Sequence, residues 1–539
     1  MILDFRAVAT PAEFDADLCI VGAGAAGIAI AQALAGKSLT VCIVESGGLE
    51  PDTATQALYQ GRSVGLPWAT DLSSSRLRQF GGTTGEWGGG CMPLDASDMA
   101  VRSWVPHSGW PIARAMLEPF YRRARDLLTI PAYEFGDGEL TARMRHKPVA
   151  FDPNLLANVY AMLSARPRLG ELCQPTLTRS SNITVLLNAN LIEFDVDDTA
   201  RHVRQARIRS LHGRAGRVRA KHFVLACGGI ENARLLLLSN SVSKLGLGND
   251  SDNVGRFFMD HPSGRLGSIV SEHSEALIAA YDRHRTRRTL PIYPEIALSE
   301  RLQVQRRTLN GRVRPAAFEE NVADGIVAFR NLRSGIATGA PGRLSSQLRR
   351  ILTDIDHVAP SVWRVLRGRP AVAARRIELH GFFEQAPNPD SRISLGGDLD
   401  AFGQRRVQLD WRLTELDRHT FETAATTFSA ELTRLGLGRV QLDPWLCPGG
   451  RPFEGVGGAA HHIGTTRMSN DPAAGVVDAD CRVHGMENLH VAGSSVFPTG
   501  GWAFPTFTIV ALALRLADRL AGYAAKSASA RAASPEFSR

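Results

Sequence analysis

Three glycines near the start of the chain have the residue type and spacing needed to bind a dinucleotide. Gly22, Gly24 and Gly27 stand in VGAGAAG, a GxGxxG pattern. The first permits a tight turn, the second lets backbone approach a pyrophosphate, and the third lets a helix pack close to a strand. Glu45 follows roughly 20 residues later, where a carboxylate accepts hydrogen bonds from a ribose 2′-OH. Because a carboxylate repels a 2′-phosphate, the pattern favours FAD or NAD over NADP.

A βαβ unit is predicted to position these residues. Leu18–Val21 has the composition of a short buried strand, Ile28–Leu34 of a helix, and Leu39–Val44 of a second apolar strand. The helix N-terminus then presents free N–H groups to the phosphates. Ala25 and Ala26 in the first turn, and Ser46 after the second strand, are predicted to contact the cofactor as well.

A second glycine-rich loop, FGGTTGEWGGG, is expected to lie against the cofactor. Its glycines give a backbone that can lie flat on a planar ligand, with N–H groups and hydroxyls free to donate. The candidate contacts in it are Gly81, Gly82, Thr83, Thr84, Trp87 and Gly88.

Two later stretches return to the same site. HFVLACGGIENARLLLLS predicts a strand, a glycine turn and a helix beginning near Glu231, with Ala226 at the cofactor. Asn488–Ala492 predicts a strand ending at Gly493 and Ser494, and a helix over Pro505–Ala521 begins with Pro505 and Thr506.

Bulk composition is that of a soluble enzyme of two or three domains. The 539 residues are 44% hydrophobic and 22% charged, and the net charge of +8 is spread thinly. The sequence lacks a basic segment interleaved with aromatic residues, the pattern that would indicate nucleic-acid binding. Seven scattered cysteines without CxxC spacing predict reduced thiols and no metal or haem site. With no signal sequence and no long apolar run, we expect a cytoplasmic protein without a membrane span.

Two other segments contain charged or titratable residues for which we favour a structural role. Asp260 and His261 precede Pro262 in a predicted turn between domains, and we interpret His261 as structural. The arginine-rich segment Arg343–Arg376 has apolar residues at helical spacing. We predict a solvated amphipathic helix there, with a docking face for a partner or an anionic membrane as the alternative.

Taken together, the motifs resemble the glucose-methanol-choline (GMC) family of FAD oxidoreductases, particularly members grouped with bacterial fructose and sorbitol dehydrogenase large subunits and with pyranose oxidase. The resemblance spans nearly the whole chain and rests on GAGAAG with Glu45, FGGTTGEWGGG, ACGGIENARLLL, NVGRFFMDHP, NPDSRISL, HHIGTTRM and NLHVAGSSVFPTGG. It implies oxidation of an alcohol carbon by hydride transfer to flavin N5. An electron-acceptor partner is compatible with it.

The resemblance also implies the fold. We expect an α/β FAD-binding domain of Rossmann type built from separate segments, and an α+β substrate domain with an antiparallel sheet flanked by helices. The predicted boundaries are 1–262 for the first FAD-domain segments, with a helical excursion at about 100–180, then 263–443 for the substrate domain. Residues 444–525 return to the FAD domain with the catalytic motif, and 526–539 form a disordered tail.

The same resemblance assigns the catalytic base to His461, three residues before the GT of HHIGTT. An imidazole with a pKa near 6.5 can accept the hydroxyl proton. His462 is a supporting candidate.

Two positions depart from the family pattern. Glu86 precedes Trp87 where relatives with covalent FAD have histidine, so the flavin is expected to be held without a covalent bond. Phe504 replaces the second catalytic residue, Asn or His, and its ring can neither donate to an alkoxide nor accept a proton. The loss is on the order of 3 kcal/mol unless His462, Glu86, a backbone amide or water substitutes, or unless Phe504 packs against an aromatic or apolar substrate.

Three functions follow from these observations. The first is a FAD-dependent oxidoreductase acting on a hydroxyl-bearing small molecule. The second, suggested by Phe504, is a flavoenzyme with non-alcohol chemistry such as desaturation or rearrangement. The third is a flavin-binding scaffold subunit, for which the basic segment after Arg343 is the sequence feature.

Overall fold

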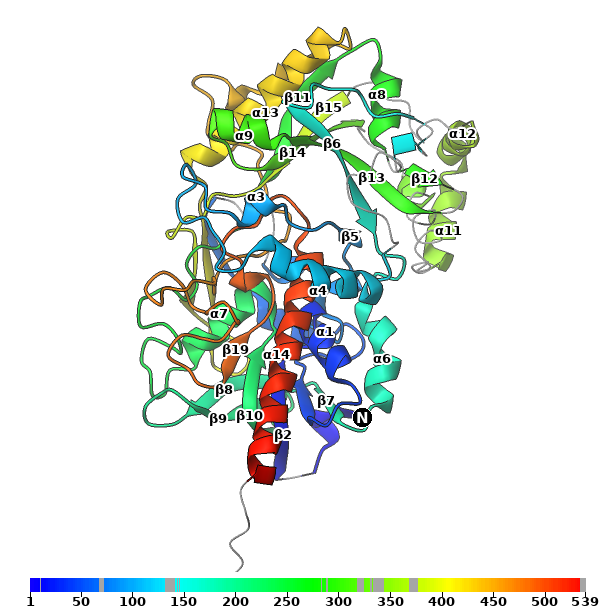
Figure 1. Cartoon of the computed structure of the whole chain (residues 1–539). Helices are drawn as coiled ribbons and strands as arrows, with labels where there is room; N and C mark the ends of the chain where they lie inside the picture. Colours follow the sequence, from blue (N-terminus) through cyan, green and yellow to red (C-terminus); the bar gives the residue numbers. More distant parts are fainter. Residues whose placement is uncertain are drawn as a thin grey trace, which may run out of the picture.

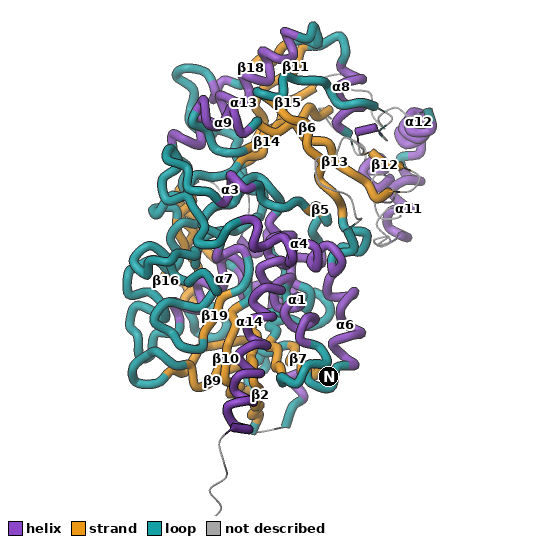
Figure 2. Tube along the Cα trace, viewed as in Figure 1, coloured by secondary structure: helices purple, strands orange, loops and turns teal. Residues whose placement is uncertain are grey.

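A computed structural model provides the structure of the chain. It describes residues 1–9, 11–66, 72–130, 141–142, 144, 146–282, 284–286, 289–317, 324–329, 332, 344–367 and 377–533. Figures 1 and 2 show two groups of strands at opposite ends of the molecule, joined by loops and covered by helices.

The first sheet is mainly parallel and contains the predicted βαβ unit. Its strand order is β1-β7-β3-β2-β10-β9-β8, with β19 paired to β10. The pairs from β1 to β10 and the pair with β19 are parallel, whereas β8, β9 and β10 pair antiparallel. The strands are β1 (Ile2–Asp4), β2 (Ala12–Val21), β3 (Val41–Val44), β7 (Ile183–Leu187), β8 (Asn190–Val196), β9 (Val203–Arg209), β10 (Ala215–Leu225) and β19 (Leu489–Val491).

Both faces of this sheet are buried at its centre, because the unbroken apolar runs LCIV in β2 and VCIV in β3 are buried at every position. Figure 1 shows α14, in red, beside α1 and α4. The helices of this part are α1 (Ala25–Leu34), α2 (Thr53–Gln56), α3 (Ala96–Met99), α4 (Arg114–Leu127), α6 (Leu169–Arg179), α7 (Gly228–Leu238) and α14 (Pro505–Ala533).

The second sheet is antiparallel, with the order β18-β11-β15-β14-β13-β6-β5 and β12 beside β13. Its strands are β5 (Gly90–Cys91), β6 (Leu156–Leu163), β11 (Ser263–Val270), β12 (His284–Thr286), β13 (Thr289–Leu298), β14 (Gly311–Ala317), β15 (Ile377–Phe383) and β18 (Arg439–Leu442). The surrounding helices are α8 (Ser274–Tyr281), α9 (Glu300–Arg306), α11 (Leu344–Thr353), α12 (Ile355–Leu366) and α13 (Glu415–Arg434).

The apolar core is divided in the same way. One cluster surrounds the first sheet, and a second lies between the antiparallel sheet and α13, where Phe383, Phe421 and Phe428 are fully buried. The predicted fold class is therefore confirmed: an α/β part assembled from separate segments, and a second part with an antiparallel sheet flanked by helices.

Some predicted segments lie differently in the structure. β6, within the expected helical excursion, pairs with β13 of the second sheet. β16 (Arg392–Leu399) and β17 (Arg405–Trp411), expected in the substrate domain, instead form a three-stranded sheet with β4 (Gly61–Gly65). Between β7 and β8 the chain turns at Asn188, which has φ of 58°.

The C-terminal helix is longer than predicted. It was expected to end at Ala521 before a disordered tail, but α14 continues to Ala533, and residues 534–539 lie outside the described part. The alanine-rich sequence AAKSASARAA explains the extension, because alanine has the highest helix propensity. The arginine-rich segment forms α11 and α12, while Arg343 and residues 368–376 lie outside the described part. In the part of the chain that is described, no helix has the length and apolarity to cross a membrane.

Candidate active site

A cavity of about 1290 Å³ is lined by residues next to the first sheet and by residues of the second sheet. Its first end is formed by the turns after β2, β3, β10 and β19, and its second end by residues of β13, β14 and β15. Because β2, β3, β10 and β19 are all parallel, their carboxyl ends lie at one edge of the first sheet. This is the edge at which open α/β sheets bind ligands.

Nearly all predicted site residues line this cavity. They are Gly22, Gly24, Ala25, Ala26, Glu45, Ser46, Gly82, Thr83, Thr84, Trp87, Gly88, Ala226, His461, His462, Gly493, Ser494, Phe504, Pro505 and Thr506. Gly27 and Gly81 do not line it. A Cβ at Gly27 would lie 2.0 Å from the Gly22 carbonyl oxygen, and one at Gly81 would lie 3.1 Å from Gly170 Cα. Both glycines therefore permit close backbone packing behind the site.

Gly24 differs from these two glycines. A Cβ added there would meet no protein atom within 4 Å, although the residue lines the cavity. Gly22, by contrast, has φ of 100° and lies against Ala226, so it serves the turn itself. Of the three glycines in the motif, Gly24 is the one whose missing side chain leaves space on the ligand side.

Glu45 is buried at the end of β3. Its two carboxylate oxygens accept the backbone N–H groups of Ala23 at 2.7 Å and of Gly47 at 2.8 Å. Burial raises the pKa of Glu45, and the two backbone donors oppose that shift. Each oxygen retains a lone pair, so acceptance from a ribose hydroxyl stays a prediction compatible with this geometry.

A buried arginine network beside the glycine turns was missed from the sequence. Glu231, at the start of α7, pairs with Arg76 at 3.0 Å, with Arg78 at 3.1 Å and with Arg234 at 3.2 Å. Burial alone would raise the pKa of Glu231, but Arg234, Arg78 and Arg76 lower it to about 2. The signal in the sequence was the RLRQ before the glycine loop, whose arginines are far from Glu231 along the chain.

These residues fit a dinucleotide. Arg78 and Gln79 both line the cavity, and within the described ranges Arg78 Nε and Gln79 Oε1 are buried without a hydrogen-bond partner. Buried polar atoms of native proteins are nearly always paired, so a polar ligand accounts for them. With the open face at Gly24, the donor set is suited to a ligand that carries phosphates and hydroxyls.

Aromatic rings and His461 form the second end of the cavity. The ring centroids of Phe504 and His461 are 5.9 Å apart with the planes at 81°, and Phe382 lies 5.9 Å from each of them. Phe504 packs over Gly90, where an added Cβ would be 2.9 Å from its ring. Phe504 is thus part of the cavity wall beside His461.

Arg312 is a second charged group of the cavity wall that the sequence did not point to. Its guanidinium lies 4.4 Å from the Phe382 centroid and 5.4 Å from the Phe504 centroid, and it forms a buried ion pair with Glu295. Arg312 lies opposite Ala297, and Glu295 is two residues from Ala297 on the same face of β13. Among the described residues, Arg312 Nε and Glu295 Oε2 have no hydrogen-bond partner.

The two adjacent histidines have different surroundings. His461 keeps some exposed surface on the cavity, whereas His462 is 6% exposed and lies 3.5 Å from the Ser75 hydroxyl. Burial and the nearby Arg312 charge lower the pKa of His461 to about 4. Burial, Arg76 and His461 lower the pKa of His462 well below its usual value. Both rings are therefore neutral near pH 7.

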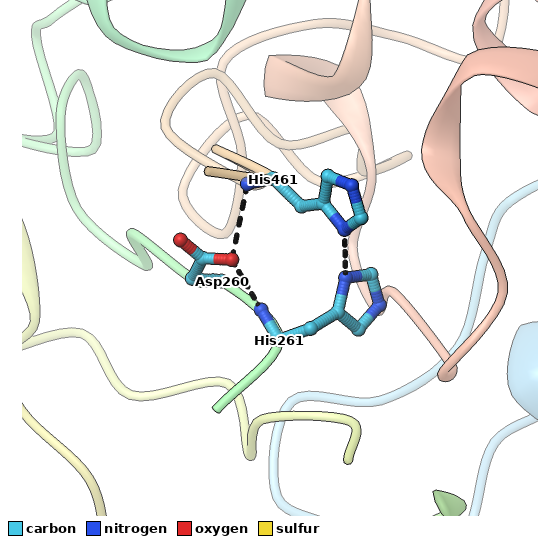
Figure 3. Close-up of side chains that lie close together, drawn as sticks. All are labelled: Asp260, His261 and His461. Atoms are coloured by element: carbon cyan, nitrogen blue, oxygen red, sulfur yellow. Dashed lines mark hydrogen bonds between the residues drawn. The ribbon is translucent and has the colours of Figure 1, made fainter. Parts of the chain in front are cut away.

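His261, interpreted from the sequence as structural, lies in direct contact with His461. Met259 and Ile463 form an antiparallel bridge, which places residue 261 opposite residue 461. The two Nδ1 atoms are 2.9 Å apart (Figure 3). Asp260 Oδ1 accepts the backbone N–H groups of both histidines, at 2.6 Å and 3.0 Å.

Comparisons with known proteins agree with this arrangement. Residues 387–513 match the GMC oxidoreductase family. The chain is 25% identical to 6'''-hydroxyparomomycin C oxidase of Streptomyces lividus, over 95% of this chain and 93% of the relative. It is 22% identical to the fructose dehydrogenase large subunit of Gluconobacter japonicus, over 94% and 97% of the two chains.

Solved structures show the same fold. Formate oxidase of Aspergillus oryzae RIB40 superposes with a TM-score of 0.54 at 17% identity, over 96% of this chain and 100% of that one. The chain is thus an oxidoreductase whose residues 387–513 match the GMC oxidoreductase family and whose fold is that of formate oxidase.

Proposed function

We propose that this enzyme oxidises a hydroxyl group of a small, sugar-like or alcohol substrate, with non-covalently bound FAD as oxidant and His461 as the base. The observation that carries the proposal is the position of His461 on the wall of the same cavity that contains the dinucleotide turns. A neutral imidazole facing a cofactor-sized cavity is suited to accept a proton from a hydroxyl group.

FAD, which the family implies, would be held by the turns at Gly24 and Gly82 and by the helix N-terminus at Pro505 and Thr506. When bound, FAD supplies the two-electron acceptor. The chain's own residues then divide the remaining work. His461 takes the hydroxyl proton, Arg312 donates to the substrate oxygen from its guanidinium, and the rings of Phe382 and Phe504 exclude water from the reacting group.

Arg312 thus provides the donor that Phe504 cannot provide. Its guanidinium lies 5.4 Å from the centroid of the Phe504 ring, which occupies the position of the family's Asn or His. The Glu295 carboxylate holds it in place while leaving Nε unpaired. A fixed cation in a buried site stabilises a developing alkoxide without reorganising.

A first prediction concerns the cofactor link. Because Glu86 stands where histidyl-linked relatives have histidine, acid precipitation of the holoenzyme is expected to release all the yellow flavin into the supernatant. Absorbance of both fractions measures this. Flavin colour that stays with the precipitate would contradict the non-covalent assignment.

A second prediction tests the dinucleotide turn. Gly24→Val is expected to weaken FAD binding about tenfold or more, because the new side chain occupies ligand space and its Cβ lies more than 4 Å from the atoms of the described residues that surround the turn. The matched control is Gly397→Val: Gly397 is an exposed residue of β16 that also has no atom within 4 Å of an added Cβ and lies outside the cavity. Flavin content and circular dichroism of both variants separate lost binding from lost folding. Full flavin content in Gly24→Val would show that the FAD pyrophosphate does not bind at this turn.

A third prediction concerns Phe504. Phe504→Asn is expected to lower activity on the natural substrate, because the change removes aromatic contact and places an amide among apolar groups, at about 1–3 kcal/mol. Stopped-flow reduction rates measure the effect, with Phe120→Leu, at a half-buried position of α4 that does not line the cavity, as the control. If the variant instead reduces faster with simple alcohols, the wild type has merely lost a donor and Arg312 does not replace it.

The function itself is tested by anaerobic mixing of the holoenzyme with D-fructose, D-glucose, paromamine and benzyl alcohol. The names of the relatives above motivate the sugars and the aminoglycoside fragment. Bleaching of the flavin band together with a carbonyl product supports alcohol oxidation. Bleaching with a different product favours desaturation or rearrangement, and no bleaching with any compound favours the scaffold role.

A further inference from the structure

We propose that His261 is a positioning residue that fixes the tautomer of His461, so that the lone pair of His461 Nε2 is ready to accept a proton. The inference deepens the proposed function and rests on it for the role of His461. It follows from hydrogen bonds that link Gly501, His261 and His461, in which each atom can act only as donor or only as acceptor. Figure 3 shows the bond between the two histidines.

The chain begins at a backbone carbonyl. His261 Nε2 lies 2.9 Å from the Gly501 carbonyl oxygen, and a carbonyl oxygen can only accept a hydrogen bond. His261 must therefore carry a proton on Nε2. The carbonyl has little freedom to move, because Gly501 has φ of 52° and an added Cβ would clash with the Asp98 carboxylate.

The second step concerns His261 Nδ1. In a neutral imidazole with its proton on Nε2, Nδ1 carries a lone pair and accepts. His461 Nδ1, at 2.9 Å, must then donate, so His461 carries its proton on Nδ1. Its Nε2 is left with a lone pair. Figure 3 shows that nitrogen on the side of the ring turned away from His261.

Both rings must be neutral for this assignment, and the surroundings favour that state. Burial and the neighbouring His461 lower the pKa of His261 well below its usual value, and burial and Arg312 lower that of His461. The charged and titratable groups around the pair are Asp260, Arg312 with its partner Glu295, and His462.

Asp260 fixes the backbones instead of the rings. Its Oδ1 accepts N–H groups from His261, His461 and Ala459, which holds the two segments at the spacing that the imidazole contact needs. The carboxylate and the two imidazoles also have potential metal-ligand atoms within 4.8 Å of one another. Because the two Nδ1 atoms already engage each other, we assign the cluster to proton placement.

The arrangement gives the base a defined direction of proton transfer. When the substrate O–H bond breaks, the proton moves to His461 Nε2 and makes an imidazolium, and the electron pair left on oxygen forms the C=O bond. The C–H hydrogen would leave with its electron pair, for which the bound FAD of the proposed function would be the two-electron acceptor. The imidazolium keeps its Nδ1–H bond to His261, which spreads the new charge. The opposite tautomer would present an N–H to the hydroxyl group and could not accept the proton.

The first test needs no substrate. Nitrogen-15 spectra of the FAD-loaded protein, labelled at histidine, distinguish protonated from unprotonated ring nitrogens, and His461→Ala and His261→Gln identify the signals. We expect His461 protonated at Nδ1 and His261 at Nε2. His461 protonated at Nε2, or a doubly protonated His261 at pH 7, would overturn the proposal.

The second test compares two replacements of His261. His261→Gln can donate to the Gly501 carbonyl and accept from His461, whereas His261→Leu can do neither. With a sugar or alcohol that bleaches the wild type, we expect the flavin reduction rate to fall about 100-fold in His261→Leu, with little change in substrate affinity, and less than about tenfold in His261→Gln. In His261→Leu the His461 signals should show both tautomers.

Equal losses in the two variants, with the His461 tautomer unchanged, would show that His261 has a packing role only. Failure of the proposed function is a separate result. It would appear as undiminished reduction in His461→Ala, or as no bleaching with any compound, while the nitrogen-15 spectra still decide whether the tautomer is fixed. If His261→Leu does not fold, the wild-type spectra and His261→Gln remain decisive.

Discussion

His461→Ala is expected to slow flavin reduction by substrate about 10²–10⁴-fold while the variant keeps its full FAD content. The alanine removes the proton acceptor from the second end of the cavity but leaves the glycine turns and the arginine network untouched. Anaerobic stopped-flow measures the rate, and the flavin spectrum measures occupancy. His212→Ala, in the exposed turn after β9, is the control.

A reduction rate within about tenfold of the wild type would show that His461 is not the base, and His462 would then be the first alternative. The wild-type pH profile adds a second criterion. Because the pKa of His461 is lowered to about 4, the imidazole is neutral and able to accept a proton above that value, and the reduction rate should fall only as the pH drops through about 4. The reduction rate should not increase near pH 6.5, where an ordinary histidine loses its proton.

The position of the glycine turns at one end of the cavity could be predicted from the sequence because the signals for these turns are local. The turn at Gly22, the acid at Glu45 and the helix after Pro505 each occupy a few consecutive residues, and each adjoins a strand or helix with a clear apolar pattern. Parallel pairing of the strands is then enough to predict that these turns lie together at one edge of the sheet.

The catalytic half depended on contacts between distant strands. Arg312 and Glu295 meet only because β13 and β14 pair in one particular register, and a shift by one residue would place them on opposite faces. His261 and His461 are 200 residues apart and are aligned by a single antiparallel bridge. Neither pair leaves a periodic or spacing signal, which explains why His261 was interpreted as structural and Arg312 was missed.

Arg312→Met is expected to produce the second large effect, a reduction rate about 10²–10³-fold lower, because the substrate oxygen loses its charged donor. Methionine keeps the length and the packing against Phe382. The same change leaves the Glu295 carboxylate buried without its partner, so the free energy of unfolding should fall by about 3–5 kcal/mol.

The double variant Arg312→Met/Glu295→Gln separates the two consequences. Neutralising Glu295 removes the unpaired buried charge, so thermal or denaturant unfolding should return most of the way to the wild type, while the reduction rate should stay low because no donor has been restored. Recovery of both stability and rate in the double variant would show that Arg312 serves only to neutralise Glu295. Recovery of stability alone leaves Arg312 as the residue that compensates for phenylalanine at position 504, and explains how the chain retains alcohol chemistry behind an apolar ring.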